Sequence, residues 1–145
     1  MAGIYLLAKP DLQLLLALLA PLVVWPWIAE GYHLADMGLL NTVVFFTLIP
    51  VAEEMLFRGW LQGWLLQRRW FAQRSLQVSR ANYCTSLVFA MAHLWQHTLM
   101  LLPGYFIVSL LLGHFRERYR GILVPILLHG YYNLGLLIAA DQIIH

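Results

Sequence analysis

Five long apolar stretches, separated by short polar connections, limit what this chain can fold into. Each is long enough, or nearly so, for an α-helix to cross the hydrocarbon layer of a bilayer, which takes roughly 20 residues. Their approximate bounds are 12–28, 38–67, 81–96, 99–115 and 122–140. With 61% hydrophobic and 11% charged residues, the 145-residue chain is far more apolar than an ordinary soluble domain. We therefore expect an all-α, polytopic transmembrane helical bundle of about five spans, forming a single membrane-embedded domain over residues 1–145.

The charged residues between the stretches predict an orientation. Basic residues accumulate on the cytoplasmic side of membrane proteins. Two spans separate the two arginine clusters, so both can be cytoplasmic; these clusters are Arg68, Arg69, Arg74 and Arg80, and Arg116, Arg118 and Arg120. Glu30 and Asp36 then mark the opposite side. These charges predict a cytoplasmic N-terminus carrying Lys9 and a C-terminus carrying Asp141 outside. The first stretch lacks a clean small-x-small cleavage site and carries Trp25, Pro26 and Trp27 at its far end, so we expect it to be an uncleaved span.

Charge and cysteine content exclude other classes of protein. The formal net charge of +2 and the clustered arginines give no support for binding nucleic acid, whereas a bilayer explains them directly. Cys84 is the only cysteine, so no internal disulfide can form. We expect no cofactor, and the partner that the composition indicates is the bilayer.

Three charged residues interrupt the second apolar stretch. Inserting a charged side chain at the bilayer centre costs roughly 2.5–3.5 kcal/mol of free energy. Glu53, Glu54 and Arg58 are therefore expected to pair with one another or to have a function. Glu54 and Arg58 are four residues apart with the acid first, the favourable order for an ion pair on a helix. Glu53 points about 100° away around the helix and can present a carboxylate to a cavity. The alternative is an ion cluster that only holds helices together.

Polar residues in two other stretches reach a similar depth. His93 follows Phe89 by one helical turn, so the phenyl ring can wall the imidazole, and His129 and Asn133 share a face in the last stretch. Taken alone, each histidine fits a packing role as well as a chemical one. At 1.5 Å of rise per residue, however, Glu53, His93 and Asn133 each lie about 20 Å from the basic end of their stretch. That common level favours a buried polar site.

Three short motifs carry a family resemblance. Residues 53–58 read EExxxR, residues 89–93 read FxxxH and residues 129–133 read HxxxN. In this order, on separate spans, they resemble the CAAX-protease and bacteriocin-processing (CPBP, or ABI) family of intramembrane glutamic endopeptidases. The resemblance covers about residues 42–140. It implies a protein of the prokaryotic plasma (inner) membrane, a compact member linked to C-terminal sorting signals, whose intramembrane site opens to the cytoplasm.

The resemblance also implies roles for individual residues. Glu53 would be the general base that activates water, helped by His93, while His129 and Asn133 would hold the developing oxyanion. A peptide bond near the end of a membrane-associated protein or peptide would be cleaved. The residues that would shape the site are Glu54, Arg58 and Phe89.

Two alternatives remain open at this point. A zinc-dependent protease could use Glu53, His93 and His129 as ligands, although no HExxH motif places two ligands one turn apart. A non-enzymatic immunity or partner-binding protein could keep the polar cluster only to hold its helices together.

Overall fold

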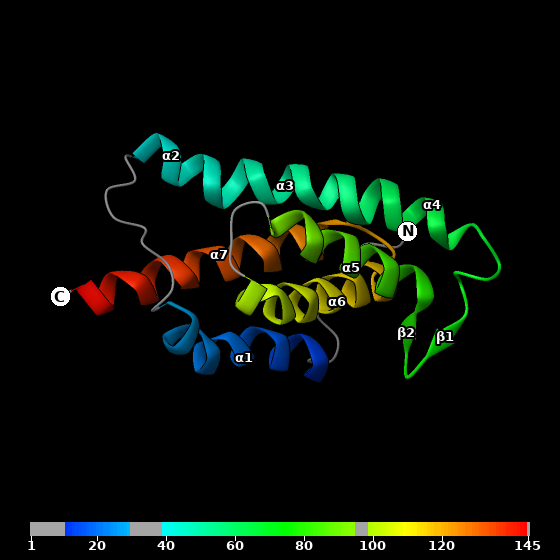
Figure 1. Cartoon of the computed structure of the whole chain (residues 1–145), viewed down its shortest axis with the longest axis horizontal. Coiled ribbons are helices and arrows are strands. Elements are labelled where there is room, and N and C mark those ends of the chain that lie inside the picture. The colour runs from blue at the N-terminus through cyan, green and yellow to red at the C-terminus, as the bar shows by residue number, and fades with distance from the viewer. Residues whose placement is uncertain (1–10, 30–38, 95–98, 145) are drawn as a thin grey trace. The chain divides into compact units, whose positions relative to one another are not determined.

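The computed structural model describes residues 11–29, 39–94 and 99–144, and most of these are helical (Figure 1). All five apolar stretches form helices close to the expected bounds, which confirms the all-α prediction. The elements in chain order are α1 (Leu12–Ala29), α2 (Leu39–Val43), η2 (Val44–Leu48), α3 (Ile49–Glu54), η3 (Met55–Gln62), α4 (Gly63–Leu66), β1 (Arg74–Ser75), β2 (Val78–Ser79), α5 (Arg80–His93), η4 (Leu99–Leu101), α6 (Leu102–Arg118) and α7 (Leu123–Ile144). The predicted end of the third stretch at Gln96 and the markers Lys9, Glu30 and Asp36 lie outside the described residues.

The chain divides into two compact units. The first joins residues 1–37 to residues 132–145, and in it Tyr132 Oη donates a 3.0 Å hydrogen bond to the carbonyl of Ala17. The second comprises residues 38–131 and contains every element from α2 to the first part of α7. The single domain expected over residues 1–145 stays a prediction.

The second apolar stretch forms one unbroken helix made of α2, η2, α3, η3 and α4. Two of its segments, η2 and η3, are π-helical. Pro50 lies at the start of α3 and has no amide hydrogen, so it cannot donate to the carbonyl of Phe46 four residues earlier. Turns of π-helix inside α-helices are uncommon and occur frequently at functional sites. Here η3 directly follows Glu53 and Glu54.

One helix in the described residues is long and apolar enough to cross a bilayer. It runs from Leu40 to Leu66 with a mean hydropathy of 1.5. A shorter apolar helix covers Leu12–Leu22. The arrangement of about five spans therefore stays a prediction beyond this one helix.

Helices α5 and α6 pack closely against each other in the second unit. Ala90 and Leu112 are fully buried. A Cβ atom at Gly113 would lie 1.9 Å from Oδ1 of Asn82, so the Asn82 side chain occupies the space beside this glycine. Asn82 Nδ2 also donates a 2.9 Å hydrogen bond to the carbonyl of Leu110. These contacts fix the register of α5 on α6, and with it the position of the end of α5.

A β-hairpin, which the sequence did not predict, closes the first arginine-rich connection. β1 pairs with β2 in an antiparallel manner, with Arg74 opposite Ser79. The turn residues Leu76 and Gln77 have φ values of +50° and +69°, which suit the tight turns of hairpins. Glu117 of α6 secures the hairpin through a 2.7 Å ion pair with Arg74 and a hydrogen bond from Ser79 Oγ.

Candidate active site

The ion pair predicted between Glu54 and Arg58 is present. Arg58 Nη1 lies 3.1 Å from Oε1 of Glu54, and both side chains are fully buried. Arg58 Nη2 donates hydrogen bonds to Oγ and to the carbonyl of Ser109 on α6, at 2.9 and 3.2 Å. The guanidinium carbon also lies 4.6 Å from the ring centre of Phe89. An uncompensated buried charge costs several kcal/mol, so these contacts explain how the arginine remains inside.

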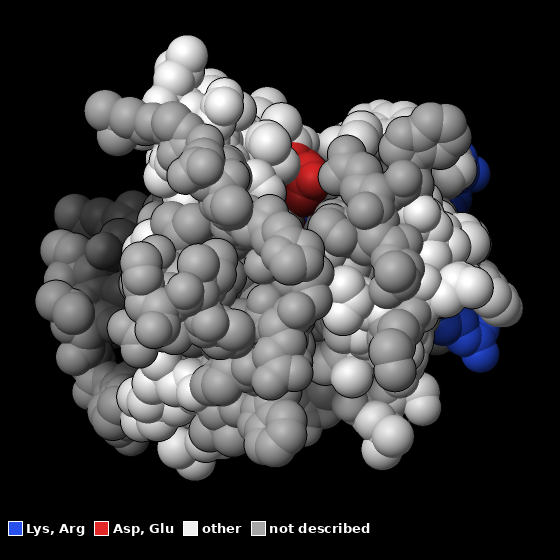
Figure 2. All heavy atoms as spheres, turned by 60° about the vertical axis from the view of Figure 1, so that its left-hand side comes forward, with Lys and Arg blue, Asp and Glu red and all other residues white. Residues whose placement is uncertain are grey.

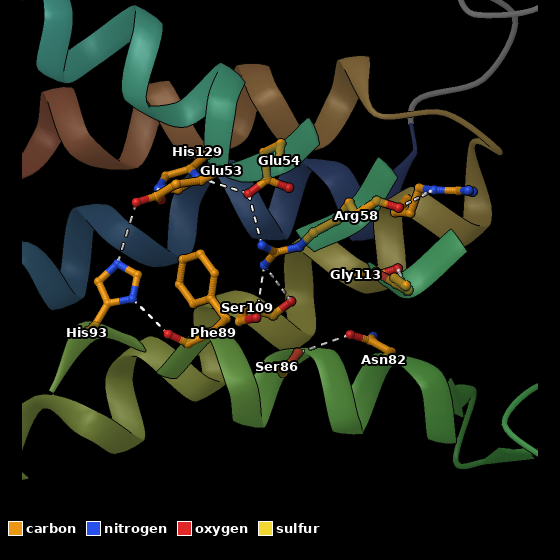
Figure 3. A network of polar contacts seen from close by, with 12 residues as sticks. Glu53, Glu54, Arg58, Asn82, Ser86, Phe89, His93, Ser109, Gly113 and His129 are labelled. Carbon is orange, nitrogen blue, oxygen red and sulfur yellow. Dashed lines mark hydrogen bonds and ion pairs between the residues drawn. The ribbon is translucent and has the colours of Figure 1, made fainter. Parts of the chain in front are cut away.

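Glu53 points away from this pair and lies between two imidazoles. Its side chain is 26% exposed, with Oε1 4.0 Å from Nε2 of His93 and Oε2 3.5 Å from Nε2 of His129 (Figure 3). On the face shown in Figure 2, acidic side-chain atoms reach the surface at a place away from the basic side chains. The structure therefore brings a partly accessible carboxylate from α3 together with histidines from α5 and α7.

His129 contacts both neighbouring glutamates. Its Nδ1 lies 2.9 Å from Oε1 of Glu54, while its Nε2 faces Glu53. Because carboxylate oxygens accept hydrogen bonds, Nδ1 carries the hydrogen in this contact. Glu54 thereby fixes the ring so that Nε2 is directed toward Glu53. The contact joins residues 75 positions apart, and no spacing in the sequence predicted it.

His93 is held by its own helix. Its Nδ1 lies 2.8 Å from the carbonyl of Phe89, one turn earlier. A carbonyl only accepts, so this nitrogen donates and Nε2 is the atom that faces Glu53. The rings of Phe89 and His93 have centres 4.4 Å apart, which confirms that the phenyl ring walls the imidazole.

Asn133 lies one turn after His129 on α7 and is half-buried. It belongs to the first compact unit, whereas Glu53, His93 and His129 belong to the second. Its role beside His129 stays a prediction.

A further buried polar residue, Gln62, supports the same region. It is fully buried, and its Nε2 donates to the carbonyl of Gly113 and to Oε1 of Glu117, at 3.1 and 2.9 Å. The sequence interpretation missed these contacts. Two matching four-residue spacings were the available signal: Arg58 to Gln62 in η3, and Ser109, Gly113 and Glu117 in α6.

The sequence left open a zinc site formed by Glu53, His93 and His129. In the part of the chain that the structure describes, no group of three or more His, Cys, Asp or Glu side chains is arranged to hold a metal ion. The three side chains are arranged as a carboxylate between two imidazoles, one of which is already bonded through Nδ1 to Glu54.

An apolar, helical fold in which a carboxylate faces two histidines presents a candidate hydrolytic site. Residues 35–135, well over half of the chain, match the family described as type II CAAX prenyl endopeptidase, Rce1-like. The chain belongs to this family, which confirms the resemblance carried by the EExxxR, FxxxH and HxxxN motifs. The matched region contains all three motifs.

A curated protein from Escherichia coli, named "Uncharacterized 24.3 kDa protein", is similar to this chain. The two are 35% identical over an alignment of 109 positions, and the match covers 68% of this chain and 44% of the relative. The chain thus spans less than half the length of that relative. No solved structure matches the chain.

Proposed function

We propose that this chain is an intramembrane endopeptidase that uses a glutamate base and no metal ion. It hydrolyses a peptide bond near the end of a membrane-associated protein or peptide. The position of Glu53 carries this proposal. Glu54 already neutralises Arg58, so a purely structural ion cluster would not need a second carboxylate, partly exposed and 3.5 to 4.0 Å from two imidazoles.

In the first step, Glu53 takes a proton from a water molecule as the water oxygen attacks the carbonyl carbon of the substrate. The carbon–oxygen bond forms, and the carbonyl oxygen becomes an oxyanion. His129, held by its hydrogen bond from Nδ1 to Glu54, stabilises this oxyanion together with the Asn133 amide. Donors held in place before the reaction stabilise the developing charge without reorganisation.

In the second step, the oxyanion collapses and the carbon–nitrogen bond breaks. The leaving amine takes the proton that Glu53 removed from water, relayed through Nε2 of His93, which faces that carboxylate. Nδ1 of His93 is held by the Phe89 carbonyl, so the ring presents the same nitrogen throughout. Glu53 returns to its carboxylate form, and the products are a carboxylic acid and an amine.

In the membrane, the chain has about five spans in a prokaryotic plasma membrane, with the N-terminus inside and the C-terminus outside. The site then opens toward the cytoplasm. The family name refers to prenylated CAAX substrates, so a farnesylated CAAX peptide is the first probe. The same peptide without the lipid shows whether the prenyl group is required.

The test is Glu53→Gln in protein reconstituted into liposomes and assayed with both peptides. We expect cleavage to be abolished, because the amide cannot accept the proton from water, while circular dichroism and the melting temperature stay unchanged. Retained turnover in this variant would overturn the proposal. Asp11→Asn is the matched control, since Asp11 caps α1 by accepting hydrogen bonds from the amides of Gln13 and Leu14, and asparagine also caps helices.

The non-enzymatic alternative draws on the buried contact between Arg58 and Ser109, which ties η3 to α6. An immunity or partner-binding protein would need this contact between the helices but would not need Glu53 to accept a proton. Its signature is a cellular phenotype that persists in both Glu53→Gln and His129→Ala.

A further inference from the structure

Four planar groups from three helices stack in a column beside Glu53. The guanidinium carbon of Arg58 lies 4.6 Å from the ring centre of Phe89, and the centres of the Phe89 and His93 rings are 4.4 Å apart (Figure 3). Tyr105, near the start of α6, continues the column. Its ring centre lies 4.5 Å from that of His93, with only 26° between the ring planes.

The imidazole of His93 is therefore clamped by two aromatic rings. The Phe89 ring is inclined by 35° to the imidazole and the Tyr105 ring by 26°, so both lie over a face of the ring. Two rings stacked at about 4.5 Å on the same face would overlap, so they occupy opposite faces. No spacing in the sequence singled out Tyr105, because the stack forms between α5 and α6.

The two aromatic rings restrict a tilt of the His93 imidazole that the backbone hydrogen bond alone would allow. The contact from Nδ1 to the Phe89 carbonyl fixes one atom of the imidazole, but the ring can still tilt about that atom. Rings on both faces prevent this tilt and keep Nε2 directed at Glu53, 4.0 Å away. A catalytic group held in its productive geometry reacts faster than one that samples several orientations.

We infer that Tyr105 is a positioning residue for the proposed hydrolysis: its ring holds His93 in the orientation that presents Nε2 to Glu53. The inference rests on the proposed function, because His93 relays a proton only there. It assigns the role to the aromatic ring of Tyr105, so phenylalanine at this position should replace tyrosine.

The kinetic test compares Tyr105→Leu with Tyr105→Phe, with Tyr83→Leu as the matched control. Tyr83 lies on α5, the helix that carries His93, and is 39% exposed. We expect Tyr105→Leu to lower kcat about tenfold, equivalent to about 1.4 kcal/mol, with KM unchanged. Tyr105→Phe and Tyr83→Leu should both keep the kcat of the unmodified protein. An equal fall in the phenylalanine and leucine variants, or none in either, would overturn the inference.

A second measurement does not depend on activity. The protein is labelled with ¹³C at Cε1 of histidine, and the His93 signal is identified as the one that disappears in His93→Gln. The rings of Phe89 and Tyr105 shield the Hε1 proton of His93, because they stack on its imidazole. We expect its resonance to move downfield in Tyr105→Leu and to stay in place in Tyr105→Phe. An unmoved resonance in Tyr105→Leu contradicts the clamp, whereas inactive protein with the expected shift would contradict only the proposed protease function.

Discussion

Nδ1 of His129 and Oε1 of Glu54 lie 2.9 Å apart, which joins helix α7 to the end of α3. The same oxygen lies 3.1 Å from Nη1 of Arg58, so Glu54 holds a histidine and an arginine at once. We predict that Glu54→Gln lowers kcat about tenfold or more, because His129 loses the carboxylate that orients it. The free energy of unfolding should fall by about 3 kcal/mol, since the buried charge of Arg58 loses its partner. Peptide cleavage and denaturant unfolding measure the two effects.

Ser109→Ala tests whether Glu54 affects catalysis through His129 or through Arg58. It removes the hydrogen bond from Arg58 to the hydroxyl and keeps the one to the backbone carbonyl. We expect a loss of about 1 kcal/mol in stability and an unchanged kcat. If Ser109→Ala lowered kcat as much as Glu54→Gln, the effect of Glu54 would act through Arg58 and not through His129.

Contacts within a helix could be predicted from the sequence, because residues four apart share a face. This rule correctly paired Glu54 with Arg58 and placed Phe89 against His93. It also separated the direction of Glu53 from that of its neighbour.

Contacts between helices could not be predicted in the same way, because they depend on how each helix is rotated and where two helices cross. The contacts of His129 with Glu54 and of Arg58 with Ser109 are of this kind. The π-helical turn of η3 further changes which residues of that helix share a face. The hairpin was missed because its strands have only two residues each, too few to show alternation, and its turn lacks the usual asparagine and glycine.

Gly130, next to His129, lets α7 approach the helix that runs from Leu40 to Leu66. A Cβ atom there would lie 3.0 Å from the carbonyl oxygen of Phe46, the carbonyl to which Pro50 cannot donate. We predict that Gly130→Ala moves α7 outward by a few tenths of an ångström and lowers kcat severalfold, because His129 is the adjacent residue. The melting temperature should change little, since alanine favours the helix by about 1 kcal/mol and offsets the contact.

Gly104→Ala is the control for this substitution. A Cβ atom at Gly104 would meet nothing within 4 Å, and the residue is also helical. It should keep the full kcat. A normal kcat in Gly130→Ala would contradict this prediction. It would mean that catalysis does not require His129 to be held within a few tenths of an ångström.

Chelation separates the glutamate mechanism from the zinc alternative. A zinc enzyme would lose activity when the metal is removed and regain it with added Zn²⁺. We predict that protein incubated with excess 1,10-phenanthroline keeps its full rate of peptide cleavage. Elemental analysis of the purified protein should find less than stoichiometric zinc. Loss of activity that zinc restores would assign Glu53, His93 and His129 to a metal.

The side from which a substrate reaches Glu53 depends on the orientation of the long helix. Glu53 lies about midway between Leu40 and Leu66, about 20 Å from either end at 1.5 Å of rise per residue, so depth alone does not choose a side. Single cysteines at Leu76 and Leu40, 91% and 75% exposed, report on the two ends once Cys84 is replaced by serine.

We predict that an impermeant maleimide labels Leu76→Cys in inside-out vesicles only and Leu40→Cys in right-side-out vesicles only, because the arginines flanking Leu76 favour the cytoplasm. The reverse pattern would place the hairpin outside. Leu40 would then mark the cytoplasmic end of the helix. A substrate coming from the cytoplasm would have to reach Glu53 from that end. Peptide added to sealed inside-out vesicles checks this directly, since cleavage there requires a site open on the side that Leu76 marks.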